Sequence, residues 1–201
     1  MAISRDNKAV FLDRDGVINE LVYHQEQEII DSPFTPAQFR LLPDVGEAIK
    51  KLQETGYKVI LVSNQPSLAK GTISENVFAA VRSKMAKELA KSGVSLDGEY
   101  YCFHHPEGKI KKFTTNCECR KPKPGMLLQA AEEMSLDLSR AWMVGDNLSD
   151  IKAGKSAGTK TILLGRMKCE LCRLMDEEDS RPDTIVPNLI EAVRFITDAG
   201  D

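Results

Sequence analysis

The sequence has no apolar run as long as a membrane span, and Met1–Lys8 is too polar for the hydrophobic part of a signal peptide. Its formal net charge of -3 gives no general attraction to nucleic acid or to an anionic membrane surface. It contains no internal repeat and no low-complexity linker. We therefore expect a cytoplasmic protein without a nucleic-acid or membrane partner, whose five cysteines are reduced and available to metal. We also expect a monomer.

The sequence does contain short apolar runs that alternate with stretches of helical spacing. Its 201 residues, 42% of them apolar and 28% charged, are enough for one domain, residues 1–201, with a sizeable core. Strands are expected at 9–12, 58–62, 100–103, 141–144, 160–164 and 184–186. Helices are expected after Pro43, after a capping box at Thr72–Glu75, after Pro124, before Ala157 and after Pro187. This alternation predicts an α/β, doubly wound, Rossmann-like three-layer sandwich with a mostly parallel sheet.

Residues 20–42 have weak periodicity and contain two prolines, so we expect an irregular excursion over the carboxyl ends of the strands. Tyr23 and His24 in this segment are candidates either to contact a substrate or to pack the loop. No large cap domain is evident in the sequence. The excursion and the polar stretch 104–123 are therefore the segments expected to cover the strand ends.

Polar side chains follow the strands expected at 9–12, 58–62 and 141–144, and a basic pair lies in the polar stretch before the last of these. They are Asp13, Asp15, Ser63, Asn64, Asp146 and Asp150, with Arg120 and Lys121 as the basic pair. The carboxyl ends of parallel strands meet at one edge of a sheet, where ligands bind. Carboxylates suit Mg²⁺, whereas a hydroxyl, an amide and a lysine suit phosphate oxygens. The alternatives are an ordinary acidic turn and a solvated basic pair before a proline.

The same residue types suit phosphoryl transfer. A carboxylate can attack phosphorus and form an aspartyl-phosphate. An acid two residues later, as Asp15 is from Asp13, can serve first as proton donor and then as proton acceptor.

The polar stretch also supplies four candidate zinc ligands, Cys102, His104, Cys117 and Cys119. Three cysteines and one histidine form a recognised closed zinc site, and the one-residue spacing inside each pair argues against a nucleic-acid finger. His105 is a competing ligand, and buried free thiols are the alternative to metal. Cys169 and Cys172 form a lone C-x-x-C, for which inert thiols, a labile disulfide and a second metal site stay open.

These motifs resemble those of the haloacid dehalogenase (HAD) superfamily of phosphatases. The matching segments are Asp13-x-Asp15-Gly16-Val17, Ser63-Asn64-Gln65, Arg120-Lys121-Pro122 and Gly145-Asp146-x-x-x-Asp150. They occur in the right order on the expected element types and cover the chain from residue 9 to 165. The resemblance implies a HAD-like fold with no large cap and with an inserted zinc loop at 102–119.

Within the superfamily, the chain is similar to the heptose 1,7-bisphosphate 7-phosphatases and to the related histidinol-phosphate phosphatases. The shared segments are Phe11–Gly16, Asn64-Gln65, Tyr101–Pro106 and Cys117–Pro122. The sequence departs from the heptose enzymes in the longer segment after Asn19, in Pro66-Ser67 and in Asn147. These departures concern the rim of the site, so they affect the expected substrate and not the expected reaction.

The resemblance implies roles for the acidic residues. Asp13 attacks phosphorus, and Asp15 protonates the leaving oxygen and then activates the water that hydrolyses the aspartyl-phosphate. Mg²⁺ is bound by Asp13, the backbone carbonyl of Asp15, and Asp146. Asp150 orients this set.

The resemblance also implies the binding residues. Phosphate and substrate are bound by Ser63, Asn64, Gln65, Arg120 and Lys121. Zinc is bound by Cys102, His104, Cys117 and Cys119, since the family pattern selects His104 over His105.

We therefore expect a Mg²⁺-dependent phosphatase of a phosphorylated sugar, D-glycero-D-manno-heptose 1,7-bisphosphate at its 7-phosphate, with zinc in a structural loop. A histidinol-phosphate phosphatase is the alternative in the same class. A zinc-stabilised binding module without turnover is the alternative from another class, and the intact Asp13 and Asp15 argue against it.

Overall fold

The computed structural model describes residues 7–165 and 179–198. Over these residues the central sheet has six parallel strands in the order β5-β4-β1-β6-β7-β8. The strands are β1 Ala9–Leu12, β4 Lys58–Asn64, β5 Gly98–Cys102, β6 Trp142–Gly145, β7 Lys160–Leu164 and β8 Thr184–Val186. Each lies at or within a few residues of its expected position, so the predicted doubly wound α/β fold is confirmed.

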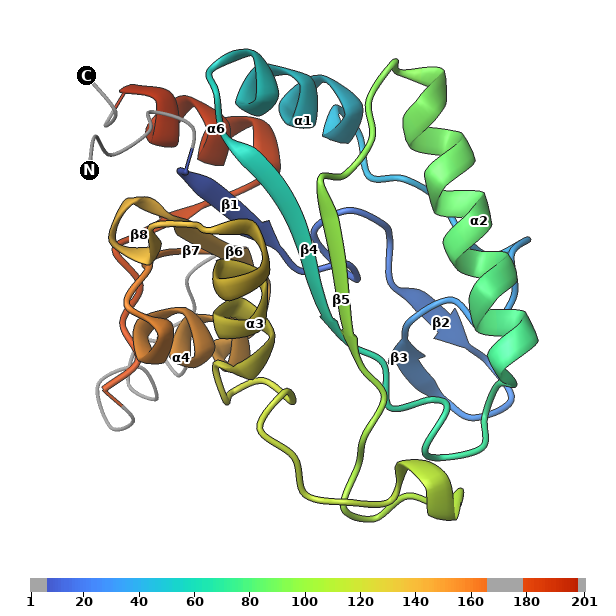
Figure 1. Cartoon of the computed structure of the whole chain (residues 1–201). Coiled ribbons are helices and arrows are strands. Elements are labelled where there is room, and N and C mark those ends of the chain that lie inside the picture. Colours follow the sequence, from blue (N-terminus) through green and yellow to red (C-terminus); the bar gives the residue numbers. More distant parts are fainter. Residues whose placement is uncertain (1–6, 166–178, 199–201) are drawn as a thin grey trace.

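Helices cover both faces of the sheet (Figure 1). They are α1 Val45–Glu54, α2 Glu75–Lys91, α3 Gly125–Met134, α4 Leu148–Ala157 and α6 Leu189–Asp198, with short 3-10 helices η1 Lys111–Phe113 and η2 Leu138–Arg140. Val10 and Leu12 pack with residues of α1, α2 and α6, whereas Ala9 and Phe11 pack with residues of α3 and α4. Both faces of β1 are therefore buried, which explains its continuously apolar sequence.

Helix α2 begins at a different cap from the predicted one. Ser74 has an extended backbone, and its Oγ accepts a hydrogen bond from the Val77 N–H at 3.3 Å. The Thr72 N–H donates to the Ser67 carbonyl at 2.9 Å. Thr72 therefore belongs to the preceding turn, and the prediction of a capping box starting at Thr72 is wrong.

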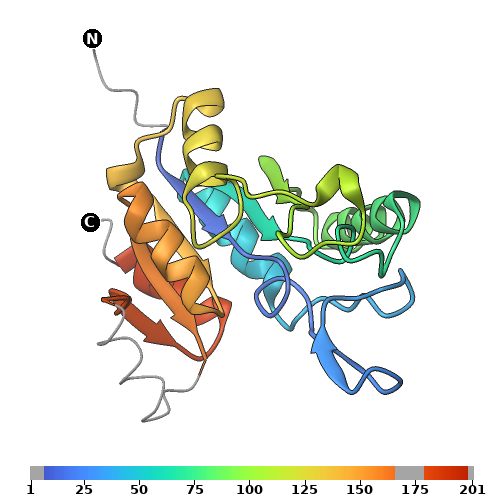
Figure 2. The same cartoon turned by 90° about the horizontal axis from the view of Figure 1, so that it is seen from below.

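The excursion after β1 contains an antiparallel hairpin, so the prediction of a wholly irregular segment is wrong. Its strands are β2 Val22–His24 and β3 Ile29–Asp31. Figure 2 shows the hairpin projecting from the body of the molecule. His24 is buried, its ring stacks on Phe34 at a centroid distance of 3.7 Å, and its Nε2 lies 2.9 Å from the Ser32 carbonyl oxygen. His24 therefore packs the loop.

Between β1 and α1 the described chain adds this hairpin and no cap domain. Which segments cover the strand ends stays a prediction. Within the same described ranges, no helix combines the length and the apolar character needed to cross a bilayer.

Candidate active site

The carboxyl ends of β1 and β6 bring three acidic side chains together. Asp13 follows β1, Asp146 follows β6, and Asp150 lies in the first turn of α4. One carboxylate oxygen from each lies within 4.8 Å of the others. The parallel pairing of Leu12 with Val144 explains this meeting, because it places the ends of the two strands at the same level.

Lys121 lies inside this acidic group. Its Nζ is 2.9 Å from Asp13 Oδ1 and 2.6 Å from Asp150 Oδ1, and it donates to the Val62 carbonyl oxygen at 2.9 Å. The side chain is buried. Burial opposes its charged form, but the two carboxylates outweigh burial and raise the pKa of Lys121. Lys121 is therefore a fixed positive charge that faces Asp13.

One lysine does not neutralise three carboxylates. Burial raises the pKa of Asp13 to about 7; Lys121 opposes this shift, and Asp150 and Asp15 add to it. Burial and Asp150 raise the pKa of Asp146 to about 6, again against the effect of Lys121. A divalent cation supplies the missing positive charge, and carboxylate oxygens suit Mg²⁺. The donor set therefore fits a magnesium site.

Two glycines make room for the acidic side chains. Gly16 has a left-handed φ of +83°, and a Cβ at this position would lie 2.1 Å from Asp146 Oδ2. At Gly145 a Cβ would lie 2.2 Å from the Cβ of Asp150. Larger residues at these positions would displace the carboxylates, which explains a glycine in each of the two motifs.

The Asp15 carboxylate is bound by three other side chains. Arg14 Nη2 and Asn19 Nδ2 donate to Oδ1 at 3.1 and 2.9 Å, and Gln65 Nε2 donates to Oδ2 at 2.8 Å. Gln65 Nε2 also donates to Ser63 Oγ at 2.9 Å. The sequence did not single out Arg14 or Asn19, because spacing alone does not show that an arginine between two aspartates is buried.

Asn64 attaches the segment that carries Lys121. Asn64 Nδ2 donates to the Lys121 carbonyl oxygen, and the Lys121 N–H donates to Asn64 Oδ1, both at 3.0 Å. This pair of hydrogen bonds fixes the main chain of Lys121 to the end of β4. Arg120 is half-buried, and its Nη1 lies 3.4 Å from the His104 carbonyl oxygen.

A second cluster consists of Cys102, His104, Cys117 and Cys119, whose ligand atoms lie within 4.8 Å of one another. Its Sγ–Sγ distances are 3.0, 3.3 and 3.5 Å. A tetrahedral Zn²⁺ with Zn–S bonds of about 2.3 Å separates its ligands by about 3.8 Å, so the cluster fits one zinc ion after small shifts. His105 is not in the cluster, and its Nδ1 accepts from the Glu107 N–H. Cys169 and Cys172 lie outside the described residues.

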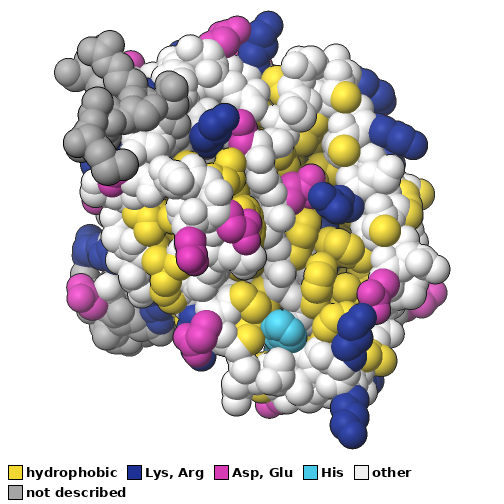
Figure 3. Space-filling view, viewed as in Figure 1, with side chains coloured by type: hydrophobic (Ala, Val, Ile, Leu, Met, Phe, Trp, Pro, Cys, Tyr) yellow, Lys and Arg dark blue, Asp and Glu magenta, His cyan; other side chains and the backbone are white. Residues whose placement is uncertain are grey.

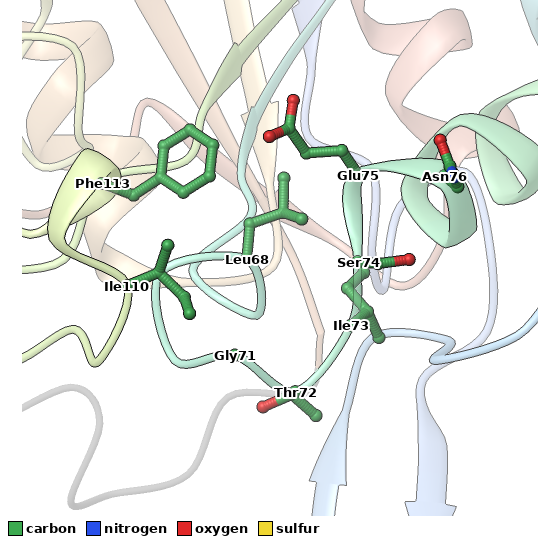
Figure 4. A pocket seen from close by; sticks show the side chains of 9 residues that line it. All are labelled: Leu68, Gly71, Thr72, Ile73, Ser74, Glu75, Asn76, Ile110 and Phe113. Carbon is green, nitrogen blue, oxygen red and sulfur yellow. The ribbon is translucent and has the colours of Figure 1, made fainter.

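The loop between the cluster residues contacts the segment before α2 and the first residue of that helix. The Ile110 N–H donates to the Ala69 carbonyl at 2.9 Å, and Lys112 Nζ lies 2.9 Å from Glu75 Oε1. Figure 4 shows the crevice between the two segments, whose apolar side chains are Leu68, Ile73, Ile110 and Phe113. Hydrophobic side chains also gather over β5 and α2 in Figure 3. Phe113 of the loop packs with Leu68, Ala69 and Phe78, so apolar contacts hold this loop in addition to the cluster.

Comparisons with known proteins agree with this fold and site. A family model described as HAD-hydrolase-like matches residues 118–192, which contain Lys121, Asp146 and Asp150. The structure is similar to D,D-heptose 1,7-bisphosphate phosphatase from B. bronchiseptica complexed with magnesium and phosphate, with a TM-score of 0.76 and 28% identity. That similarity covers 96% of this chain and 99% of the other. The fold and the site define a protein of the HAD-like hydrolase class.

Sequence relatives narrow this class. D-glycero-beta-D-manno-heptose-1,7-bisphosphate 7-phosphatase of Haemophilus ducreyi is 38% identical over 190 residues, which are 94% of this chain and 98% of that protein. The enzyme of the same name from Pasteurella multocida is 45% identical over 157 residues, 78% of this chain and 80% of that protein. The chain belongs to the D-glycero-beta-D-manno-heptose-1,7-bisphosphate 7-phosphatase family.

Proposed function

We propose that this chain is a Mg²⁺-dependent phosphatase that hydrolyses D-glycero-D-manno-heptose 1,7-bisphosphate at the 7-phosphate through an aspartyl-phosphate. The observation that carries the proposal is the position of Asp13, which faces Lys121 at 2.9 Å and shares a group with Asp146 and Asp150. Such a placement stabilises the charge that develops in phosphoryl transfer. The identity of 38% and 45% to enzymes of that name supports the substrate.

Asp13 is held in one orientation for attack. Its Oδ1 accepts hydrogen bonds from the Arg14 N–H at 2.7 Å and from Lys121 Nζ at 2.9 Å. A carboxylate oxygen of Asp13 attacks phosphorus while the bond from phosphorus to the sugar oxygen breaks, and Asp15 gives its proton to that oxygen. Asp15 then takes a proton from the water that attacks phosphorus, and the bond to Asp13 breaks to release phosphate.

Asp13, Asp146 and the backbone carbonyl of Asp15 are the proposed Mg²⁺ ligands. When bound, Mg²⁺ offsets the negative charge of the phosphoryl oxygens and of the carboxylates. Asp150 holds Lys121 through Oδ1 and accepts from the Asn147 N–H through Oδ2 at 3.1 Å. Both of its oxygens are thus engaged, which supports a role for Asp150 in orienting the lysine.

The residues proposed to build the phosphate and substrate site, by direct contact or by holding a residue that makes contact, are Ser63, Asn64, Gln65, Arg120 and Lys121. Ser63 and Lys121 bind the phosphoryl oxygens, Asn64 acts by fixing the Lys121 main chain, and Gln65 acts by its hydrogen bond to Ser63. Arg120 contacts the substrate beyond the phosphate. Zinc held by the cysteine cluster keeps the Arg120-Lys121 segment in place. A cytoplasmic location and a monomeric state stay predictions.

Phosphate release and ³¹P NMR of the products test the proposal. With Mg²⁺ present, the heptose 1,7-bisphosphate should lose its 7-phosphate and keep its 1-phosphate, with a higher kcat/KM than fructose 1,6-bisphosphate or histidinol phosphate. Asp13→Asn is the matched control, because the amide has the same size and cannot attack phosphorus. A higher kcat/KM for histidinol phosphate would contradict the proposed substrate and favour a histidinol-phosphate phosphatase. A folded, Mg²⁺-loaded protein that hydrolyses none of these esters would favour the alternative of a zinc-stabilised binding module without turnover.

A further inference from the structure

The carboxylate of Asp15 is enclosed by donors from three side chains that do not reach solvent. Arg14, Asn19 and Gln65 are 1%, 0% and 1% exposed. Arg14 binds the carboxylate with both Nε and Nη2, at 3.2 and 3.1 Å, and Asn19 Nδ2 binds Oδ1 at 2.9 Å. An arginine fork and two amides leave the carboxylate few orientations.

Gln65 connects this carboxylate to the phosphate side of the site. Its Nε2 lies 2.8 Å from Asp15 Oδ2 and 2.9 Å from Ser63 Oγ. Its own main chain is fixed as well, because the Gln65 N–H donates to the Cys102 carbonyl at 2.7 Å. One buried amide therefore sets the distance between the proton-transferring residue and a phosphate-binding hydroxyl.

We propose that Gln65 is a positioning residue that aims Asp15 at the leaving oxygen of the substrate, an inference that rests on the phosphatase function proposed above. Gln65 is enclosed, so it acts through Asp15 and Ser63 and not by touching the sugar. Proton transfer depends steeply on placement, because a shift of about 1 Å can cost roughly a hundredfold in rate. Arg14 and Asn19 hold the other side of the same carboxylate.

This role predicts a dependence on the leaving group that a general loss of structure does not produce. A sugar alkoxide is strongly basic and needs the proton of Asp15 as it departs, whereas p-nitrophenolate leaves as an anion. Loss of alignment should therefore slow alkyl esters more than p-nitrophenyl phosphate. Values of kcat/KM isolate this step, because they include events only up to departure of the leaving group.

The experiment compares Gln65→Met with the parent enzyme. Methionine keeps the length of the side chain and removes the donor. With Mg²⁺, kcat/KM is measured for p-nitrophenyl phosphate and for the sugar bisphosphate. The ratio of sugar to aryl ester should fall by roughly tenfold or more. Thr161→Val is the matched control, because it removes a buried hydroxyl on β7 that donates to Asp183, and it should leave the ratio unchanged.

Circular dichroism checks that each variant is folded. If Gln65→Met does not fold, Gln65→Glu takes its place, since it has the same size, replaces the donor by an acceptor and predicts the same change in the ratio. Equal losses for the two esters, or a greater loss for the aryl ester, would overturn the positioning role. A parent enzyme that hydrolyses neither ester would instead overturn the phosphatase function itself.

Discussion

Replacing Lys121 with methionine removes the positive charge inside the acidic group and keeps most of the side-chain volume. Lys121 Nζ lies 2.9 Å from Asp13 Oδ1 and 2.6 Å from Asp150 Oδ1. Removing one partner of a buried ion pair costs about 3–5 kcal/mol, because the other charge stays buried without compensation. We expect a loss of this size in the free energy of unfolding at pH 8 in EDTA.

The loss should be smaller at pH 5. Asp13 has a pKa of about 7 even beside Lys121, so without the lysine it takes up a proton at pH 5 and relieves the repulsion. Activity should respond as well. Lys121 faces Asp13, the proposed nucleophile, and loss of one such electrostatic contact lowers kcat by roughly 10²–10³-fold.

Urea denaturation at the two pH values measures the difference. The single tryptophan, Trp142, lies in β6 and reports unfolding of the sheet by its fluorescence. Lys123→Met is the matched control, because Lys123 pairs with Glu118 at an exposed surface and its loss should leave the denaturation midpoint unchanged. Parental stability of Lys121→Met at pH 8 would refute the reasoning. Equal losses at pH 5 and pH 8 would refute the part assigned to Asp13.

Three further predictions concern other parts of the site. Gly16→Ala should weaken activation by Mg²⁺ roughly tenfold or more in a titration of activity, because its Cβ meets Asp146; Gly93→Ala, also at positive φ but with open space around it, should leave activation unchanged. In EDTA, the free energy of unfolding should be highest below pH 3.8, the ordinary pKa of Asp13, and should fall as pH rises to about 7, because the folded protein keeps the Asp13 proton over a range in which the unfolded chain releases it. Asp13→Asn should lack this part of the pH dependence in thermal melts. Cys117→Ser should lower zinc content by metal analysis and raise KM for the bisphosphate more than for p-nitrophenyl phosphate; unchanged zinc content would remove Cys117 from the ligand set.

The centre of the main sheet could be predicted because β1, β4, β6 and β7 are buried almost throughout. A strand such as β1 must then be apolar at every position, and this signal is strong even over four residues. The acids at the strand ends could be predicted for a related reason, since parallel strands bring their carboxyl ends to one edge. The parallel sheet and the meeting of the acids at its edge both follow from the order of strands and helices along the chain. That order can be predicted from short segments of sequence.

The hairpin and the cap of α2 could not be predicted in the same way. Strands β2 and β3 have three residues each, too few to show a period of two, and Tyr23, Ile29 and Ile30 are exposed apolar residues that do not mark a core. At α2 both Thr72 and Ser74 are suitable caps. The choice of Ser74 depends on the turn that uses the Thr72 N–H, which is a matter of backbone geometry.

The buried Arg14 illustrates a deeper limit. From the sequence, an arginine between two aspartates is expected to lie in solvent. Burial of the Arg14 guanidinium is tolerated because it forms an ion pair with the Asp15 carboxylate. The partners Asn19 and Gln65 complete that arrangement from a turn and from another strand end. These partners come together only in the folded chain. The spacing of the motifs therefore identifies Asp15 but not the side chains that bind its carboxylate.

Cys102 links the cysteine cluster to the acidic group at the strand ends. Its thiol belongs to the cluster that fits zinc, while its carbonyl oxygen accepts the Gln65 N–H at 2.7 Å. On the other side of the cluster, Lys121 follows Cys119 by two residues and is held to β4 by Asn64. A metal ion bound in the cluster would thus hold in place both Gln65, which donates to Asp15, and Lys121, which faces Asp13. We infer that an ion bound there would support the side chains proposed to be catalytic, in a chain whose described residues include no cap domain over the strand ends.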